Sequence, residues 1–169
     1  MYLSNVDIKK AIRKGEIKIE PLSEEQIGPA SIDLTLDNVW WVPKKKMFPV
    51  DLRKVGWEEV MEKKVAGTIV LKPGELCLGI TKEKITLSDN ILGKLEGRSR
   101  YARVGLSVHV TAALVQPGVS NHQVLEIVNN APFPVIVGEG MRVSQIIFAR
   151  TKSKTSKPYR KVGKIAVRQ

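Results

Sequence analysis

From Val65 onward the sequence consists of short apolar runs separated by turn residues, and this pattern constrains the fold more than any other feature. The runs are "GTIVL", "LCLGIT", "ILGKLEG", "LSVHVT", "QVLEIVN", "FPVIVGEG" and "RVSQIIFAR". Turns between them are expected at Pro73-Gly74, at Pro117-Gly118 and over 138–140. Many short runs of this kind are typical of an all-β sandwich or barrel. The sequence therefore predicts a mainly β fold.

The segments before this region predict a few additional elements. Residues 4–15 read as a short helix that Ser4 caps and Gly15 ends, and residues 31–38 alternate apolar and polar side chains as a half-buried strand does. A further short helix is expected in "WEEVMEKK" at 57–64. We expect one domain over 1–150, followed over 151–169 by a basic tail that lacks apolar periodicity and is mobile enough to act as a lid.

Composition limits the class of protein and its partners. A chain of 169 residues with 43% hydrophobic content suits one domain with a buried core. No apolar stretch is long enough to span a membrane, and the N-terminus is too polar for a secretory signal, so we expect a cytoplasmic protein without membrane contact. The net charge of +11 favours nucleotide phosphate or nucleic acid as a partner. Because aromatic residues are only 5% and are not interleaved with basic ones, nucleic acid is the less favoured of the two.

Glu126 is an unusual residue for the middle of an apolar strand. Alternation places it on one face with Val124 and Val128, while Leu125 and Ile127 point to the other face. An ionised carboxylate left unpaired in an apolar core is costly. Either this face is open to solvent, or the carboxylate has a chemical function.

The segment "EGRSRYARVGL" interrupts the β pattern with a candidate anion site. Ser99 is expected to cap one or two helical turns that end at Gly105. Backbone N–H groups at the start of the turns, together with Arg98, Arg100 and Arg103, could bind phosphate. The same pattern also fits an ordinary helix cap with solvated arginines.

Three segments in this order resemble the dCTP deaminase family, which is related to the trimeric dUTP hydrolases: "GRSRYARVGL" at 97–106, "HVTAALVQPG" at 109–118 and "LEIVN" at 125–129. "IGPASIDLTL", "PGE" and "KPYRKVGK" are supporting matches. The resemblance implies a dUTPase-like fold, a distorted jelly-roll β-barrel, assembled as a homotrimer with active sites at subunit boundaries. It also implies hydrolytic deamination of a deoxynucleoside triphosphate, dCTP, to dUTP and ammonia.

The resemblance also assigns residues to roles. Glu126 would be the general base, the Ser99 hydroxyl and the Ala112 carbonyl would hold the water, and Arg103 would orient the carboxylate. The residues implied in substrate binding are Arg98, Ser99, Arg100, Arg103, Gln116, Val124, Leu125, Tyr159 and Lys164. Magnesium would be held by the triphosphate and not by protein side chains. Zinc is not expected, because Cys77 is the only cysteine and zinc-dependent nucleobase deaminases need several metal ligands of this kind.

Several positions depart from the family pattern and keep two other functions open. Arg100 replaces a serine, Gln116 an aspartate and Asn121 a glycine, and the tail ends soon after Lys164. In the related dUTP hydrolases the aspartate activates water, which a neutral amide cannot do. Gln116 together with Glu126 therefore favours deamination over a dUTP diphosphatase or a bifunctional enzyme. A non-catalytic trimer that binds nucleotide or nucleic acid is the other alternative. For His109 and His122 we expect structural roles.

Overall fold

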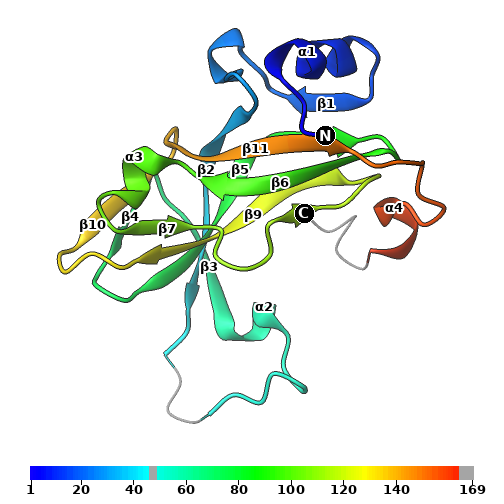
Figure 1. The fold of residues 1–169 in the computed structure, drawn as a ribbon. Helices are drawn as coiled ribbons and strands as arrows, with labels where there is room; N and C mark the ends of the chain where they lie inside the picture. Colours follow the sequence, from blue (N-terminus) through cyan, green and yellow to red (C-terminus); the bar gives the residue numbers. More distant parts are fainter. Residues whose placement is uncertain (46–48, 164–169) are drawn as a thin grey trace.

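The computed structural model describes residues 1–45 and 49–163, and strands dominate it (Figure 1). Nine strands of the described chain form one sheet: β1 (Ile17–Glu20), β2 (Ile32–Pro43), β3 (Met61–Val65), β5 (Leu76–Leu87), β6 (Ile91–Gly97), β7 (Leu106–Val108), β8 (Leu114–Val115), β9 (Ser120–Asn129) and β11 (Arg142–Arg150). The strand order is β7-β9-β5-β2-β11-β6-β8, with β1 paired to β5 and β3 paired to β2. A separate antiparallel pair joins β4 (Thr68–Leu71) to β10 (Val135–Gly138).

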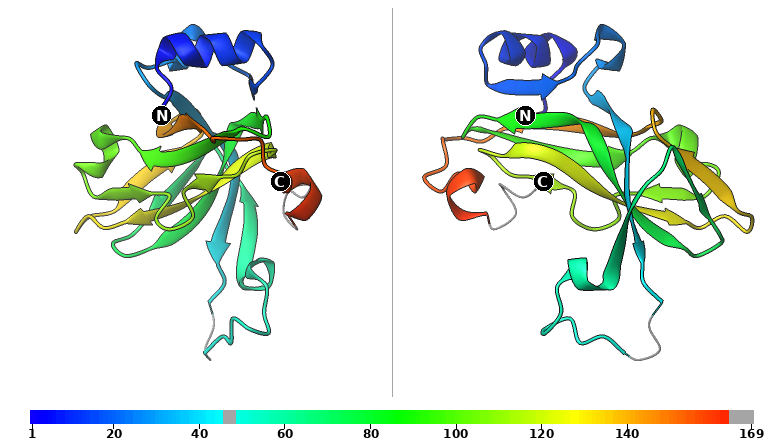
Figure 2. Two further views of the ribbon diagram at one scale, coloured as in Figure 1. Left: turned by 45° about the vertical axis from the view of Figure 1, so that its right-hand side comes forward. Right: turned by 180° about the vertical axis from the view of Figure 1, so that it is seen from behind.

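The large sheet curls around a hydrophobic core and forms an open barrel (Figure 2). The side chains of Leu34, Trp40, Leu125, Ile127 and Phe148 are completely buried in this core. They alternate along their strands with more exposed residues, as the period of two requires. The mainly β, jelly-roll-like fold predicted from the sequence is confirmed.

The N-terminal helix α1 (Asn5–Arg13) also agrees with its prediction. Ser4 and Asp7 form a reciprocal capping box at its start, and Gly15 adopts a φ of 70° just beyond its end. Ile8 and Ala11 are buried, so the helix packs its apolar face against the sheet. None of the described helices is long and apolar enough to cross a membrane.

The second predicted helix, over 57–64, is only half correct. The helical part, α2, covers Trp57–Val60, and the rest of the segment becomes β3. Residues Met61–Val65 pair with Val39–Pro43 of β2, so ladder hydrogen bonds replace the weak helical preference there. The hairpin of β2 and β3 extends away from the barrel and carries α2 near its tip (Figure 1).

The described part of the tail, residues 151–163, lies against the barrel, and its mobility stays a prediction. The backbone N–H groups of Tyr159 and Arg160 donate to the carbonyls of Pro117 and Gly118, at 2.9 and 3.2 Å. The Arg160 guanidinium binds both carboxylate oxygens of Asp89. The tail also contains a short helix, α4 (Tyr159–Val162), and thereby covers the turn that follows β8.

Candidate active site

Glu126 lies on the outer face of the curled sheet, as the alternation along β9 predicts. Its ladder partner on β5 is Leu78, whereas its neighbours Leu125 and Ile127 are fully buried on the core side. The Glu126 side chain retains 29% exposure. The Glu126 side chain is therefore partly buried and partly exposed to solvent. Such a position suits a carboxylate that must contact a ligand.

His109 is an ionisable neighbour of this carboxylate, with its Nδ1 3.4 Å from Oε2 of Glu126. The His109 backbone N–H donates to the Glu126 carbonyl at 2.7 Å, and His109 has a φ of 63°, which is uncommon for a residue other than glycine. Both ring nitrogens and Oε2 of Glu126 are buried without a hydrogen-bond partner in the described chain. Buried polar atoms without partners are costly, and they are characteristic of sites that bind a water or a ligand.

The expectation of a purely structural His109 did not anticipate this arrangement. A single histidine in a strand-like run gives no indication of its partner. The contact arises because β7 pairs with β9 in a register of Val108 to Ile127, which brings His109, the residue that follows β7, beside Glu126. The left-handed backbone conformation of His109 could likewise not be predicted from the sequence.

The arginine-rich segment forms the predicted short helix, α3 (Ser99–Ala102), but its cap differs from the prediction. Arg98 occupies the N-cap position and Ser99 is the first helical residue, so the Ser99 hydroxyl does not cap the helix. The turns end at Gly105, as predicted, with a φ of 89°. The Ser99 side chain is exposed and remains available for a ligand.

Arg98, Ser99 and Arg100 line one cavity of about 290 Å³. The Arg98 guanidinium lies 3.1 Å from Oδ2 of Asp33 and donates to the Arg142 carbonyl at 3.0 Å. Burial raises the pKa of Asp33, against the opposing effects of Arg98 and Arg142. The cavity thus presents an oriented guanidinium, a hydroxyl and a second arginine, a set that can bind phosphate oxygens.

The donor set of this cavity bears on the expected magnesium ion. Among the described residues, no three His, Cys, Asp or Glu side chains are grouped closely enough to hold a metal. Asp33 and Glu25 are the two carboxylates that line this cavity, and each forms an ion pair with an arginine. This fits Mg²⁺ bound chiefly through phosphate oxygens and water, the usual arrangement for that ion.

Burial raises the pKa of the Cys77 thiol to about 12, so this residue is a poor thiolate ligand for a metal such as zinc.

A larger cavity, of about 630 Å³, lies beside the first, and Ser99 borders both. His109 lines this larger cavity together with Ala102, Gly105 and Val108. Ser99 therefore stands between the arginine-lined cavity and the surroundings of the Glu126–His109 pair. The segments 97–106 and 109–118, which were recognised as separate motifs in the sequence, therefore meet at this larger cavity.

The remaining described residues that the resemblance assigned to the site line neither of these two cavities. Arg103 and Ala112 are exposed, and within the described residues Arg103 forms no ion pair with Glu126. Leu125 is fully buried, so only its backbone could meet a ligand. Val124 lines a third cavity, on the outer face of the sheet. Gln116 is exposed in the turn that the tail covers, Tyr159 is half-buried there, and Lys164 lies outside the described residues.

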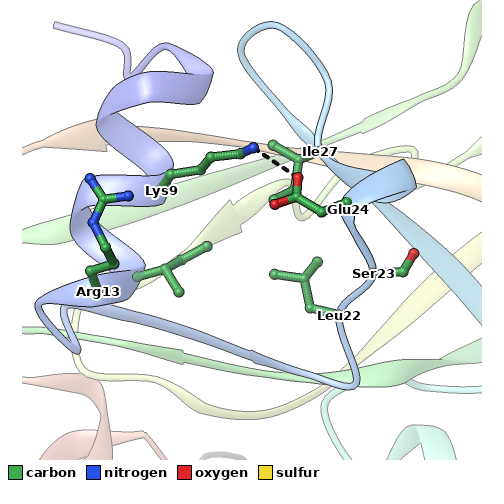
Figure 3. Close-up of a pocket in the computed structure, with 7 residues that line it drawn as sticks. Lys9, Arg13, Leu22, Ser23, Glu24 and Ile27 are labelled. Carbon is green, nitrogen blue, oxygen red and sulfur yellow. Dashed lines mark ion pairs between the residues drawn. The ribbon is translucent and has the colours of Figure 1, made fainter.

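A further pocket, of about 240 Å³, lies between α1 and the 3-10 helix η1 (Glu24–Gln26) (Figure 3). Lys9 of α1 and Glu24 form an ion pair of 2.8 Å across it. Its lining includes the apolar side chains of Ile12, Leu22 and Ile27. None of the residues that the sequence assigned to a site lines this pocket, and it remains separate from the candidate active site.

Comparison with known proteins relates this geometry to a family. The family model described as "dCTP deaminase-like" matches residues 2–151. The chain belongs to the dCTP deaminase-like family. The match covers Glu126, His109 and the α3 segment and ends before Tyr159 and Lys164, so it does not extend to the tail residues.

Two relatives illustrate the range of names within the dCTP deaminase-like family. A protein of Mycolicibacterium vanbaalenii named "dCTP deaminase, dUMP-forming" is 36% identical over 162 residues, which cover 94% of this chain and 85% of the relative. A protein of Marinomonas sp. named "dCTP deaminase" is 39% identical over 174 residues, covering 95% of this chain and 89% of the relative.

Solved structures support the fold of this family member. The 2'-deoxycytidine 5'-triphosphate deaminase of Agrobacterium tumefaciens aligns with a TM-score of 0.68 at 22% identity, over 87% of this chain and 46% of that chain. The dUTPase of phage phi11 of S. aureus aligns with a TM-score of 0.52 at 15% identity, over 83% and 94% of the two chains. At these identities the likeness shows a shared, dUTPase-like fold.

Proposed function

We propose that this protein catalyses the hydrolytic deamination of dCTP to dUTP and ammonia. The observation that carries the proposal is the outer-face carboxylate of Glu126 beside the ring of His109, with buried polar atoms on both that have no partner. Membership of the dCTP deaminase-like family and the names of the relatives support the choice of substrate.

In this mechanism Glu126 acts as a general base. It removes a proton from water as the oxygen attacks C4 of cytosine, and then delivers protons to N3 and to the departing amine. The C4–N4 bond breaks and ammonia leaves, so that dCTP and water become dUTP and ammonia. His109 is close enough to restrict the rotation of the Glu126 carboxylate and to keep it directed at the ligand.

The remaining groups of the proposed site come from two subunits of a homotrimer. Within one chain Arg103 does not pair with Glu126, and Ser99 lies at a different cavity from Val124. A second copy that brings its Ser99, Arg103 and Ala112 against Glu126 would complete the water-binding set. This arrangement explains why buried polar atoms of the pair lack partners in the single chain.

The triphosphate would lie in the arginine-lined cavity. Arg98 and Arg100 would bind its oxygens through their guanidinium groups, and Ser99 would donate its hydroxyl. Magnesium, carried by the phosphate oxygens, would neutralise part of their charge. The backbone of Val124 and Leu125 would meet the nucleoside, and Tyr159 and Lys164 of the tail would help to exclude water.

A second candidate reaction is suggested by the relatives named dUMP-forming, which would continue from dUTP to dUMP and pyrophosphate. Gln116 argues against that step here, because its neutral amide cannot act as the base for a water that attacks the phosphate chain. The exposed position of Gln116 beside Pro117 leaves it open to a ligand but does not change its chemistry.

The test is an assay of purified protein with magnesium and dCTP, CTP or dUTP, in which ammonia and the nucleotide products are both measured. Ammonia and dUTP from dCTP are the expected result. Conversion of dUTP to dUMP and pyrophosphate without ammonia from dCTP would replace the proposal with a dUTP diphosphatase. Tight, strongly salt-dependent binding of RNA or DNA without turnover of any nucleotide would favour the non-catalytic alternative.

A further inference from the structure

Glu83 of β5 is a carboxylate inside the barrel that the proposed chemistry does not use. It retains only 2% exposure, and the alternation along β5 places it on the core face with Thr81 and Ile85, which are completely buried. None of the ion pairs among the described residues includes Glu83. A carboxylate buried without a countercharge is costly, so the reason for its position lies in its hydrogen bonds.

Each oxygen of the Glu83 carboxylate accepts a hydrogen bond from a different element. Oε1 accepts from Nε2 of Gln26 in η1 at 2.7 Å, and Oε2 accepts from the backbone N–H of Thr35 in β2 at 2.8 Å. Both partner atoms are donors only, which matches a carboxylate whose two oxygens both accept. Glu83 therefore joins β5, β2 and η1 at one buried point.

The Gln26 amide extends this contact to the wall of the arginine-lined cavity. Its Oε1 accepts from the backbone N–H of Ser23 at 2.9 Å, and its Nε2 donates to the carbonyl of Asp33 at 3.0 Å as well as to Glu83. A reversed amide would turn its oxygen toward the Asp33 carbonyl and the Glu83 carboxylate, where no donor is available. The Glu83 carboxylate therefore fixes the direction in which Gln26 donates.

The same contacts hold the part of β2 that carries Asp33. The side chain of Leu34 is completely buried, so the Asp33 side chain points away from the core. There its Oδ2 lies 3.1 Å from the Arg98 guanidinium. Gln26, Asp33 and Arg98 all line the arginine-lined cavity, whereas Glu83 does not. A displacement of the Asp33 backbone would therefore move the partner that orients Arg98.

Glu83 also lies in an irregular part of its own strand. The pairing of β5 with β9 shifts in register between Ile80 and Lys84. Within this stretch the Thr81 hydroxyl donates to the Glu83 carbonyl at 2.8 Å. Bulges of this kind are over-represented next to functional sites, so the local backbone supports a functional role for this carboxylate.

We infer that Glu83 is a positioning residue for the binding of a triphosphate. Through Gln26 it fixes the backbone of Asp33, and through Asp33 it orients the Arg98 guanidinium in the cavity. The inference rests on the proposed function only for the assignment of a triphosphate to this cavity. Because Glu83 does not line the cavity, it contributes to affinity for the phosphate chain and not to the chemistry at Glu126.

The first experiment measures binding of inorganic triphosphate with magnesium by calorimetry, and steady-state kinetics with dCTP. Glu83→Gln keeps the length of the side chain but turns an NH₂ group toward one of two N–H donors, so the cluster cannot close. It should weaken triphosphate binding and raise KM about tenfold, the scale of one weakened charge-assisted hydrogen bond. The value of kcat should stay nearly unchanged, because the interaction is the same in the ground state and the transition state.

Ile85→Val is the matched control. It truncates a completely buried side chain on the same face of the same strand, and this side chain forms no hydrogen bond. The variant should have a lower melting temperature but the triphosphate affinity and KM of the parent. An equal loss of triphosphate affinity in Ile85→Val would show that any disturbance of β5 weakens the cavity, and it would overturn the specific role of Glu83.

A second experiment tests the path through Gln26. Gln26→Met removes both N–H donors of the amide and adds no charge. Because Gln26 itself lines the cavity, the coupling between the two positions is decisive and the single loss is not. The double variant of Glu83→Gln and Gln26→Met should lose no more triphosphate affinity than the weaker-binding single variant, since both changes break one chain of contacts. Additive losses would overturn this path.

If Glu83→Gln shows no cooperative thermal transition, Glu83→Asp takes its place in both experiments. Aspartate keeps the charge, but its shorter side chain can reach only one of the two donors. The same weakening of triphosphate binding is expected. A folded Glu83→Asp with parental triphosphate affinity and KM would overturn the inference.

The outcomes separate this inference from the proposed function. Weaker triphosphate binding in Glu83→Gln, when the parent releases no ammonia from dCTP, would support the role of Glu83 and overturn the deamination. Parental triphosphate affinity and KM in a folded Glu83→Gln, when the parent releases ammonia, would overturn the role of Glu83 and leave the deamination standing. A parent that does not bind inorganic triphosphate would also overturn the inference, because the cavity would then hold no phosphate chain.

Discussion

Nδ1 of His109 and Oε2 of Glu126 lie 3.4 Å apart, and both atoms are buried without a hydrogen bond in the described chain. The backbones of the two residues are joined directly, because the His109 N–H donates to the Glu126 carbonyl. A left-handed conformation at a residue other than glycine is more often found at functional sites than elsewhere. The pair is therefore held in place by the main chain, while its buried polar atoms lack the hydrogen-bond partners that a ligand could supply.

Replacing Glu126 by glutamine should abolish most of the activity without loss of substrate binding. The amide has nearly the same shape but cannot accept the proton, and loss of a general base lowers the rate by at least about a hundredfold. Single-turnover kinetics with dCTP would measure the rate, and calorimetry the affinity. A variant with near-normal turnover would show that the base has been misassigned.

Replacing His109 by asparagine should lower kcat by about tenfold to a hundredfold, because a carboxylate without its neighbour is less well oriented. Asparagine tolerates the left-handed backbone better than alanine does, so His109→Asn should keep its melting temperature, while His109→Ala should lose both rate and stability. Steady-state kinetics and thermal unfolding of the two variants are the measurements. Normal kcat in His109→Asn would mean that the imidazole has only a structural role.

Replacing Gln116 by aspartate should add dUMP and pyrophosphate to the products of dCTP, because the new carboxylate can accept a proton from water at the turn. Gln116→Asn is the matched control, since its side chain has the length of aspartate but stays neutral. Chromatography of the nucleotide products distinguishes the two. If Gln116→Asp still yields dUTP alone, the identity of this residue does not decide between the two reactions.

The ion pair of Asp89 and Arg160 should hold the tail in a pH-dependent way. The hydrogen bond from Arg160 lowers the pKa of Asp89, so the contribution of this pair is present above the unfolded-state pKa and is lost as the pH falls through the lower, folded-state value. Hydrogen exchange at the amides of Tyr159 and Arg160 should therefore be protected at neutral pH and lose extra protection, beyond the intrinsic change, in that acidic range.

The same ion pair can be tested at a fixed pH by mutation. Asp89→Asn should accelerate tryptic cleavage within residues 151–163, because the tail loses one of its anchors. Asp51→Asn removes the partner of Arg53, a more exposed ion pair that lies far along the chain from the tail, and should leave cleavage there unchanged. Equal cleavage in both variants and the parent would show that the backbone hydrogen bonds alone hold the tail.

Gly105→Ala should destabilise the protein more than Gly140→Ala. Both glycines have positive φ, at 89° and 81°, and alanine in that conformation costs about 1–2 kcal/mol. At Gly105 the added Cβ would also lie 2.7 Å from the backbone nitrogen of Ala131, whereas at Gly140 it meets nothing within 4 Å. Urea unfolding of the two variants measures the difference, and equal losses would mean that the loop at Ala131 moves aside at no cost.

The sequence by itself determined the parts of this protein that depend on local periodicity and on short motifs. Alternation along residues 123–129 was enough to place Glu126 on the face opposite Leu125, and the capping pattern at Ser4 was enough to predict the first helix. The ordered motifs indicated the family, which the comparisons confirmed. Each of these features involves residues close together in the chain, so the side-chain period or the motif specifies it directly.

Only the tertiary structure decided which distant residues meet. The proximity of His109 to Glu126, the buried contact of Glu83 with Gln26, and the contact of Asp89 with Arg160 all depend on strand register and on how the sheet curls. A shift of one residue in any ladder would turn the side chains of that strand to the opposite face. Such pairings are fixed by the packing of the whole core, which no short segment of the sequence encodes.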